Sequence, residues 1–351
     1  MRNLGGQDRE MLLSLNKKKG MERQMNFLKK EGSRNFKGFK IFFICFFSIL
    51  LCFGCKEAKI EKSSENNKEA PASVFGIDDL YGVDIFDSKN TWAVGYWGGI
   101  FYTGDGGKKW VKQDGGTTGP LYSVCFATPE KGWISGANGV ILSTSDGGKK
   151  WVRLNSGHPD KPFFLIDFVN EKTGWAVGTW GTIIKTTDGG QNWGNVSIDE
   201  DISFYDICFI DENNGWVAGE FGSVFHTADG SKTWVKQDIG AEKTLFGIYF
   251  VDALKGCAVG IDGFTIVTQD GGNTWKTVSS GSRESLFGIA GDGNLLWAVG
   301  ARGSIVKSLD AGNTWKTVKA TTHMAMSSVD LFEGHGWCVG SRAVLLKIGV
   351  Y

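Results

Sequence analysis

Six aspartates recur at nearly even intervals in this 351-residue chain, and carboxylates can bind a metal ion or serve as acid and base in catalysis. Each lies two residues after a Thr or Ser and five residues before a Trp, in the consensus pattern Thr-x-Asp-Gly-Gly-x-x-Trp. A short carboxylate in a turn can also accept backbone N–H groups one or two residues ahead, while the following Gly adopts a positive φ. Because turn chemistry alone explains this spacing, we interpret the six aspartates as structural residues and not as a metal or catalytic ring. They are Asp105, Asp146, Asp188, Asp229, Asp270 and Asp310.

The histidines do not add a metal site to this pattern. They lie in different parts of the sequence, without the Cys/His/Asp spacing that is typical of metal ligands. We therefore expect neither a metal nor a cofactor. The four residues are His158, His226, His323 and His335.

The aspartates belong to a block that occurs seven times at a spacing of 40 to 42 residues. The block begins Trp-Ala-Val-Gly, continues with Gly-x-Ile, and ends with the Asp-bearing turn and its Trp. A period of this length, with β-type residues and Gly/Asp turns, indicates a β-propeller. Residues 122–126 alternate, with Tyr122, Val124 and Phe126 on one face, as expected of a half-buried innermost strand. The sequence therefore predicts an all-β, seven-bladed propeller with four short strands in each blade.

The seventh blade requires a strand from elsewhere in the chain. Six repeats contain a Trp-bearing fourth strand, but the seventh ends after its third strand, predicted at residues 344–348. An open sheet edge would leave N–H and C=O groups unpaired. We therefore expect a strand from the N-terminal side, within residues 68–76, to close the ring, and Pro71 is tolerable on such an outer strand. The propeller domain is predicted over residues 74–351.

The turns between the second and third strands differ from blade to blade. Their variable position is aromatic in blades one, three and four and is Arg in blades six and seven, and Arg283 precedes blade six. Exposed aromatic side chains at turn tips are enriched where proteins bind partners, and arginines attract anions. The alternative is that the aromatic rings fold inward over the central channel. The candidate partner-binding residues are Trp97, Trp180, Phe221, Arg283, Arg302 and Arg342.

Three further aspartates share one position on the innermost strands. Asp84, Asp167 and Asp330 could line the channel as an acidic cluster, or each could accept a hydrogen bond from an adjacent blade.

The first seventy residues have a different composition. Residues 41–53 are almost entirely apolar, the length of a signal-peptide core and too short for a membrane-spanning helix. We predict a leader at residues 1–54 and a flexible, polar tether at residues 55–73. Beyond the leader the chain has 27 basic and 34 acidic residues, a net charge of −7, so nucleic acid is not an expected partner.

The cysteines of the repeats do not predict disulfides. Cys125 and Cys208 occupy the same strand position in blades two and four, and Cys257 and Cys338 replace different repeat residues two blades apart. Because none are neighbours, we expect buried free thiols.

Two resemblances to known families follow from these motifs. The segment Gly54-Cys55 after the apolar run resembles the lipobox of bacterial lipoproteins, which implies cleavage before Cys55, acylation of its sulfur and an extracytoplasmic, membrane-anchored protein. The block Gly-Trp-Ala-Val-Gly, Gly-x-Ile and Thr-x-Asp-Gly-Gly-x-x-Trp resembles the photosystem II stability/assembly factor family of seven-bladed propellers over about residues 75–349. That resemblance implies a monomeric scaffold without enzymatic activity, which assists assembly of a membrane protein complex by binding a protein partner. The family often carries Arg immediately before the Thr of the turn, where this chain has Tyr102, Ser143, Lys185, His226, Val267, Lys307 and Lys347.

Two other classes of function remain as alternatives. The turn pattern also resembles the Asp-box of bacterial neuraminidases, and Tyr96 with the three arginines could imitate a tyrosine nucleophile and a carboxylate clamp. The chain lacks an Arg-Ile-Pro motif, which disfavours a sialidase-like glycoside hydrolase. The second alternative is an extracytoplasmic glycan- or ligand-binding propeller that uses the aromatic turn tips.

Overall fold

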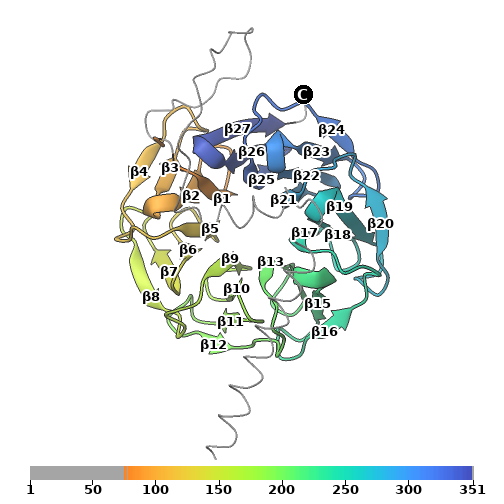
Figure 1. Cartoon of the computed structure of the whole chain (residues 1–351). Coiled ribbons are helices and arrows are strands. Elements are labelled where there is room, and N and C mark those ends of the chain that lie inside the picture. Colours follow the sequence, from red (N-terminus) through yellow and green to blue (C-terminus); the bar gives the residue numbers. More distant parts are fainter. Residues whose placement is uncertain (1–74, 77, 350–351) are drawn as a thin grey trace, which may run out of the picture. The chain divides into compact units, whose positions relative to one another are not determined.

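The described part of the chain is a closed ring of seven antiparallel β-sheets (Figure 1). The computed structural model describes residues 75–76 and 78–349. The first strand of each sheet borders the central channel and the last described strand lies at the rim. The prediction of an all-β, seven-bladed propeller is therefore confirmed. Among the described residues, no helical segment has the length and apolar character needed to cross a membrane.

The strands occupy the same four places in successive blades. The innermost strands are β1 (Leu80–Ile85), β5 (Leu121–Phe126), β9 (Phe163–Phe168), β13 (Phe204–Phe209), β17 (Leu245–Phe250), β21 (Leu286–Asp292) and β25 (Met326–Phe332). The second strands are β2 (Thr91–Gly95), β6 (Gly132–Gly136), β10 (Gly174–Gly178), β14 (Gly215–Gly219), β18 (Gly256–Gly260), β22 (Leu295–Gly300) and β26 (His335–Gly340). The third strands are β3 (Ile100–Thr103), β7 (Val140–Thr144), β11 (Ile183–Thr186), β15 (Val224–Thr227), β19 (Phe264–Thr268), β23 (Ile305–Ser308) and β27 (Val344–Gly349). The outer strands are β4 (Val111–Gln113), β8 (Val152–Asn155), β12 (Gly194–Asn195), β16 (Val235–Gln237), β20 (Lys276–Ser279) and β24 (Lys316–Val318).

Short 3-10 turns connect second and third strands in five blades. They appear as small coils in Figure 1. They are η1 (Tyr96–Gly98), η2 (Glu220–Gly222), η3 (Ile261–Gly263), η4 (Ala301–Gly303) and η5 (Ser341–Ala343).

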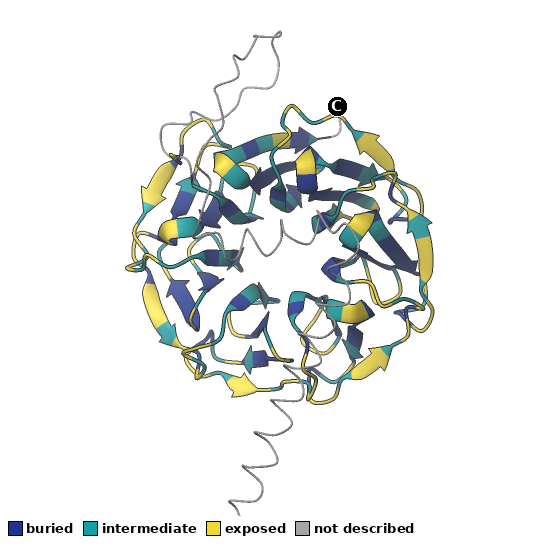
Figure 2. Cartoon of the chain, viewed as in Figure 1, coloured by how far each residue is buried: buried dark blue, intermediate teal, exposed yellow. Residues whose placement is uncertain are grey.

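Burial explains which residue types occur in each strand of a blade. Every residue of β10, Gly-Trp-Ala-Val-Gly, is buried, because neighbouring blades cover both faces of this strand. The first residues of the outer strand β16, by contrast, are exposed, and Figure 2 shows exposed strands along the rim. Continuous apolar sequence therefore marks the middle of a blade, and mixed sequence marks its edge.

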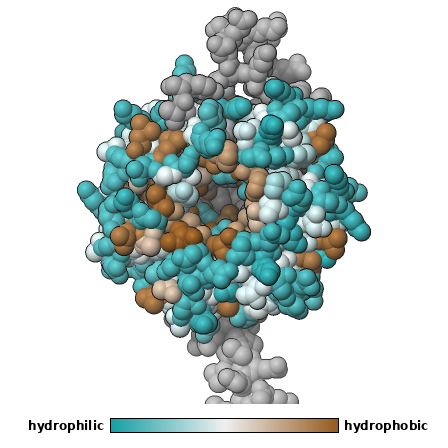
Figure 3. All heavy atoms as spheres, turned by 180° about the vertical axis from the view of Figure 1, so that it is seen from behind, coloured by the Kyte–Doolittle hydropathy of each residue, from teal (hydrophilic) through white to brown (hydrophobic). Residues whose placement is uncertain are grey.

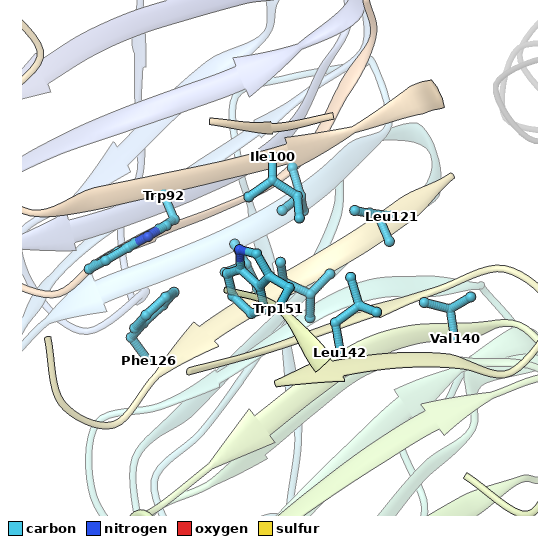
Figure 4. Close-up of a cluster of buried hydrophobic side chains, with 10 residues drawn as sticks. Trp92, Ile100, Leu121, Phe126, Val140, Leu142 and Trp151 are labelled. Atoms are coloured by element: carbon cyan, nitrogen blue, oxygen red, sulfur yellow. The ribbon is translucent and has the colours of Figure 1, made fainter. Parts of the chain in front are cut away.

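Stacked aromatic rings join one blade to the next. The indole of Trp133 in blade two lies parallel to the ring of Phe168 in blade three, with centroids 3.5 Å apart and an interplanar angle of 4°. Trp193 meets the same Phe168 edge-on at 6.0 Å. The equivalent stack of Trp92 on Phe126, with Trp151 beside it, is drawn in Figure 4. Each such Phe is thus covered by one Trp from its own blade and one from the preceding blade.

The glycine that opens a second strand is required by this stack. A Cβ on Gly174 would lie 2.5 Å from ring atoms of Phe168. Any side chain there would displace the ring that Trp133 covers. This explains why Gly precedes the repeat Trp.

The junction between blades five and six uses different residues. Cys257 stands where most blades carry the repeat Trp, and Gly291 stands where the next blade would supply the stacking Phe. Tyr249 fills the space, because a Cβ on Gly291 would lie 2.5 Å from its ring and its hydroxyl donates to the Gly291 carbonyl oxygen at 3.0 Å. Blades five and six therefore both depart from the repeat pattern at this junction, and their substitutions fit each other.

Blade seven joins blade one through side chains and backbone. The Ile85 N–H donates to Asp330 Oδ2 at 2.6 Å, and the Arg342 N–H donates to Asp79 Oδ1 at 2.8 Å. Phe75 is buried, with its ring centroid 4.6 Å from that of Phe101 and 5.4 Å from that of Trp110. Among the described residues blade seven has three strands.

Several predictions from the sequence fall on residues that the structure does not describe. The closing strand is predicted within residues 68–76, of which the structure describes Phe75 and Gly76. The leader, the tether and Cys55 also lie outside the described residues. These features stay predictions.

Replacing Trp133 with Ala should reduce the free energy of unfolding by about 3–5 kcal/mol, because the substitution removes a fully buried indole and leaves a cavity between two blades. The substitution also removes the donor to the Gly189 carbonyl oxygen. Denaturant unfolding followed by tryptophan fluorescence and circular dichroism measures the loss. Val235→Ala, at a side chain that is 64% exposed, is the control and should change stability by less than about 0.5 kcal/mol. Equal effects of the two substitutions would contradict the role of the stack.

Candidate functional site

The residues at the variable turn tips share an unusual backbone conformation. All seven have a positive φ between 53° and 56°, in the left-handed region. Asn and Asp tolerate this region, whereas bulky side chains adopt it at a cost of about 1–3 kcal/mol and are concentrated at functional sites. Two tips carry Asn or Asp and five carry Trp, Phe or Arg. The seven residues are Trp97, Asn138, Trp180, Phe221, Asp262, Arg302 and Arg342.

The three aromatic tips point into solvent. The side chains of Trp97, Trp180 and Phe221 are 61%, 62% and 49% exposed, and they are among the most exposed large apolar residues of the described chain. These rings are therefore not buried against the protein. We call the seven tip residues, together with Arg283, the crown.

Neighbouring side chains hold two of these aromatic tips in place. The ring of Trp97 lies 4.7 Å from that of Tyr96, edge-on, and Tyr96 in turn lies 6.4 Å from Tyr81 on β1. The ammonium of Lys161 lies 5.9 Å from the Trp180 ring centroid and donates to Thr182 Oγ1 at 2.6 Å. The crown thus combines exposed aromatic surface with a cation beside it.

The arginines lie on two adjacent blades. Arg283 precedes β21 and Arg302 follows β22 in blade six, while Arg342 follows β26 in blade seven, and all three are exposed. Arg302 Nε lies 3.7 Å from Glu284 Oε2, so part of its charge is compensated. Tyr96, the proposed nucleophile of the sialidase alternative, packs between Tyr81 and Trp97 in blade one.

The six aspartates of the repeated turn hold that turn together. In blade three, Asp188 Oδ1 accepts the Thr186 hydroxyl at 2.8 Å and the Asn192 N–H at 2.9 Å. Thr186 Oγ1 accepts the Gly190 N–H at 2.9 Å. These bonds lower the pKa of Asp188, with the backbone bond from Asn192 as the largest cause. The main backbone bond spans four residues and not the expected one or two, because the Thr hydroxyl accepts the nearer N–H groups. The same arrangement occurs at Asp105, Asp146, Asp229, Asp270 and Asp310.

The positions where the resembled family often has Arg cover the repeat tryptophans. The ammonium of Lys185 lies 5.0 Å from the Trp175 ring centroid, and Lys307 and Lys347 lie in the same way over the Trp of their own blades. These cations therefore pack against the scaffold.

The innermost aspartates bridge adjacent blades. Asp84 Oδ2 accepts the Phe126 N–H at 3.1 Å, Asp167 Oδ2 accepts the Phe209 N–H at 2.9 Å, and Asp330 bonds to Ile85. This resolves the two alternatives in favour of bonds between blades. Asp206 makes the same kind of bond, to the Ile248 N–H at 2.8 Å, from a position two residues earlier on its strand. Because of this offset, aligning the repeats by position did not identify Asp206 as a member of the group.

Burial shifts the ionisation of these four carboxyls. It raises the pKa of Asp206 to about 8 and that of Asp167 and Asp330 to about 6. The pKa of Asp84 is also raised well above its usual value, first by burial and then by repulsion from Asp330 and Asp167. The protein therefore encloses carboxyl groups at its centre that resist ionisation.

The second residue of every innermost strand is a β-bulge, which the sequence analysis missed. Leu121 pairs with Gly136 and Ser123 with Ser135, so the register shifts at Tyr122, and the equivalent shift occurs in all seven blades. Simple alternation placed Tyr122 on the same face as Val124, but a bulge re-aims its side chain. The sequence signal that could have marked this position is an aromatic residue, which occurs there in six of the seven repeats. The six are Tyr81, Tyr122, Phe164, Tyr205, Phe246 and Phe287, with Ser327 in blade seven.

The described residues hold no group of three or more His, Cys, Asp or Glu that could bind a metal ion. The four cysteines between residues 75 and 349 are free thiols, and burial raises the pKa of Cys257 and Cys338.

Two open cavities lie between elements of neighbouring blades. One of about 490 Å³ is bordered by Ser197, Lys232 and Trp234, and one of about 240 Å³ lies between blades seven and one beside Asp87, His335 and Lys347. Figure 3, seen from behind Figure 1, shows a central hollow bordered by apolar side chains.

Comparisons with known proteins agree with this architecture. The sequence profile of the family described as photosynthesis system II assembly factor YCF48 matches residues 51–143, 117–202 and 150–241, more than half of the chain. A solved structure of YCF48 bound to a D1 peptide is 20% identical, with a TM-score of 0.67 over 79% of this chain and 95% of that one. YCF48 from Cyanidioschyzon merolae is 22% identical, with a TM-score of 0.67 over 81% of this chain and 98% of that one. The WD40 propeller domain of Doa1 is 17% identical, with a TM-score of 0.64 over 78% and 93%. No curated protein sequence matches the chain.

The free energy of unfolding should fall as the pH rises from 6 to 8. Below its pKa of about 8, folded Asp206 keeps a proton that the unfolded Asp, with a pKa of about 3.9, has lost, so rising pH favours the unfolded state. The contribution is about 1 kcal/mol per pH unit near pH 7. Denaturant unfolding of the wild type and of Asp206→Asn at several pH values measures this contribution. The quantity compared is the change in the free energy of unfolding per pH unit, and not the free energy at any one pH. The slope should be smaller in the variant, and equal slopes would refute the assignment.

Proposed function

The chain belongs to the photosynthesis system II assembly factor YCF48 family, and from that premise we propose that it is a membrane-tethered scaffold whose crown binds a protein partner in a membrane or envelope complex. The proposed role is assembly or stabilisation of that complex by a monomeric propeller, without enzymatic activity. The family's description as assembly factors supports a binding role, and so does the propeller of the family whose structure holds a D1 peptide.

The exposure of Trp97, Trp180 and Phe221 in left-handed backbone carries the proposal. None of the three is needed to form its turn, since blade two makes the equivalent turn with Asn138. Large apolar side chains that are both exposed and conformationally costly are typical of surfaces selected for binding. Arg342 and Arg283 add donors for carboxylates of the partner.

The lipobox supports the membrane tether. Acylation at Cys55 would attach the chain to a membrane, and the polar residues 55–73 would give the propeller reach to a membrane complex. We propose an extracytoplasmic location on this basis.

Replacing Trp97, Trp180 and Phe221 together with Asn should abolish partner capture while leaving the protein at least as stable as the wild type. Asn adopts the left-handed region at lower cost, and blade two already carries it there. Crosslinking in intact cells followed by affinity purification from the envelope measures capture, and thermal unfolding measures stability.

The matched control places Asn at Val111, Val152 and Val235, which are exposed apolar residues of the rim. Capture should survive in this control. If the crown variant recovers the same partners as the wild type, the crown is not the binding surface. Suppose that neither the wild type nor the crown variant captures a protein, and that the wild type binds a glycan array but the crown variant does not. This result would assign the crown to glycan recognition instead.

Cys55→Ser should prevent lipidation and release of the leader, because acylation precedes cleavage at a lipobox. Mass spectrometry of the purified protein should show a diacyl or triacyl N-terminus at Cys55 in the wild type only. A wild-type chain with an intact, unmodified N-terminal segment in the membrane fraction would instead indicate an uncleaved anchor.

A further inference from the structure

The turns on the face opposite the crown differ in charge around the ring. Each third strand runs from a crown turn to the repeated Asp turn, so the Asp turns and the turns between first and second strands share this opposite face. In blades one and two, these two turns carry three lysines and two carboxylates in each blade. In each of blades three to seven, the carboxylates of the described turns outnumber the lysines and arginines. The positive charge of these turns is therefore concentrated in blades one and two.

Five of the six lysines in these turns of blades one and two are exposed, while Lys131 packs on the Trp133 ring at 5.1 Å. None of the five forms an ion pair with another described residue. Their ammonium groups can therefore contact another molecule without breaking an ion pair of the propeller. We call the five the basic edge, and they are Lys89, Lys108, Lys109, Lys149 and Lys150.

Most carboxylates of the same turns are held against the backbone. Asp105 Oδ1 and Asp146 Oδ1 each accept, at 2.9 Å, the N–H of the residue four positions ahead. Asp87 Oδ1 accepts two N–H groups of its own turn at 2.7 Å. These short side chains stay close to the turns, whereas each lysine carries its charge at the end of a four-carbon stem. Glu130 is the one remaining carboxylate of these turns, so an approaching surface meets mainly ammonium groups.

The basic edge adjoins the place where the N-terminal segment joins the propeller. The ring of Phe75 lies 5.4 Å from that of Trp110, the residue that follows Lys109. Cys55, the predicted site of lipidation, precedes Phe75 by 20 positions in the sequence. A chain of this length spans at most about 70 Å. A membrane that holds Cys55 therefore lies within that distance of blade one.

We propose that the basic edge contacts an anionic phospholipid surface and orients the propeller on the membrane. This inference rests on the proposed function for the tether that keeps the chain at the membrane. Anionic lipids attract basic side chains close to the bilayer surface, and a basic patch adds a second signal to a lipid anchor. The same surface repels the turns of blades three to seven, so the ring tilts toward blades one and two. The crown, on the opposite face, then points away from the lipid and stays open to a protein partner.

Lysine footprinting tests this orientation on the full chain. The protein is reconstituted into vesicles of phosphatidylcholine, with or without about one-third phosphatidylglycerol, and exposed lysines are acetylated and identified by mass spectrometry. Reactivity of the basic edge should fall at least about threefold on the anionic vesicles only, and high salt should restore it. Lys232 is the internal control, because it is exposed at the same position of the Asp turn in blade four and should react equally on both kinds of vesicle.

Two variants of equal charge identify the residues responsible. The edge variant has Gln at positions 108 and 149 and Asn at positions 109 and 150, which is the Gln191-Asn192 sequence of blade three, so the fold should be kept. Lys89, which stays in this variant, should regain its reactivity on anionic vesicles. The control variant has Gln in place of four exposed lysines of blades four to six, and Lys89 should stay protected there. Thermal unfolding shows that both variants fold. The four control positions are Lys232, Lys236, Lys276 and Lys316.

Several outcomes would overturn the membrane contact. Equal reactivity of the basic edge on neutral and anionic vesicles would do so, as would equal loss of Lys89 protection in both variants, which would indicate net charge alone. Protection of the basic edge by a soluble polyglutamate peptide, but not by anionic vesicles, would assign it to an acidic protein segment instead.

The footprint does not depend on partner capture, so this inference and the proposed function can fail separately. A protected basic edge, in a protein whose crown variant captures all wild-type partners, supports the membrane contact and rejects the crown. An unprotected basic edge, in a protein whose crown variant loses its partners, supports the crown and rejects the membrane contact.

Discussion

The face-to-face stack of a Trp on a Phe from the next blade is the interaction on which the rest of the structure depends. A blade of four short strands has no interior of its own, so each sheet must bury both faces against its neighbours. The parallel stack of Trp175 on Phe209, at 3.5 Å, is one of four such contacts that repeat with nearly the same geometry. Because every stack constrains a Trp, a Phe and the Gly that opens the second strand, these residue types must recur in the sequence.

This constraint separates scaffold from function. Residues within the stacks cannot vary singly without loss of packing, whereas the second-to-third-strand turns extend beyond the sheets and can carry any side chain that the backbone accepts. Trp97 and Asn138 occupy the same backbone conformation in adjacent blades, with φ of 56° and 53°. The chemistry at a tip is therefore chosen independently of the fold, and a costly choice such as Trp indicates selection for contact with another molecule.

The fold was predictable from the sequence because its determinants are local and repeated. The Asp188 turn, the Gly that opens the second strand and the alternating apolar residues each specify a short piece of structure, and the period assembles the pieces. The features that sequence reasoning missed arise from relations between strands. The bulge at Tyr122 is a matter of register between two strands, and the bond from Ile248 to Asp206 depends on the distance between two blades.

The candidate site likewise has features that the sequence predicts and features that it does not. The position of Trp180 at a turn tip follows from its place in the repeat, but its exposure does not, since a ring at that position could equally fold over the channel. The orientation of the six aromatic residues at the bulges could not be derived by alternation, because an extra residue in a strand inverts the face assigned to the side chains before it. A count of residue types at each repeat position would have identified these six positions without explaining them.

The junction of Cys257, Tyr249 and Gly291 fixes the order of the blades. Every other neighbour of a repeat Trp presents a large apolar side chain, whereas blade six presents a glycine that only a blade with a small residue and a tyrosine can face. Exchanging blade five for a copy of blade three would replace Tyr249 by an aspartate and Cys257 by a Trp, and the hydrogen bond from Tyr249 to the Gly291 carbonyl oxygen would be lost. The seven modules are therefore not interchangeable parts, and recombination among their similar coding segments is restrained by shape at this one seam.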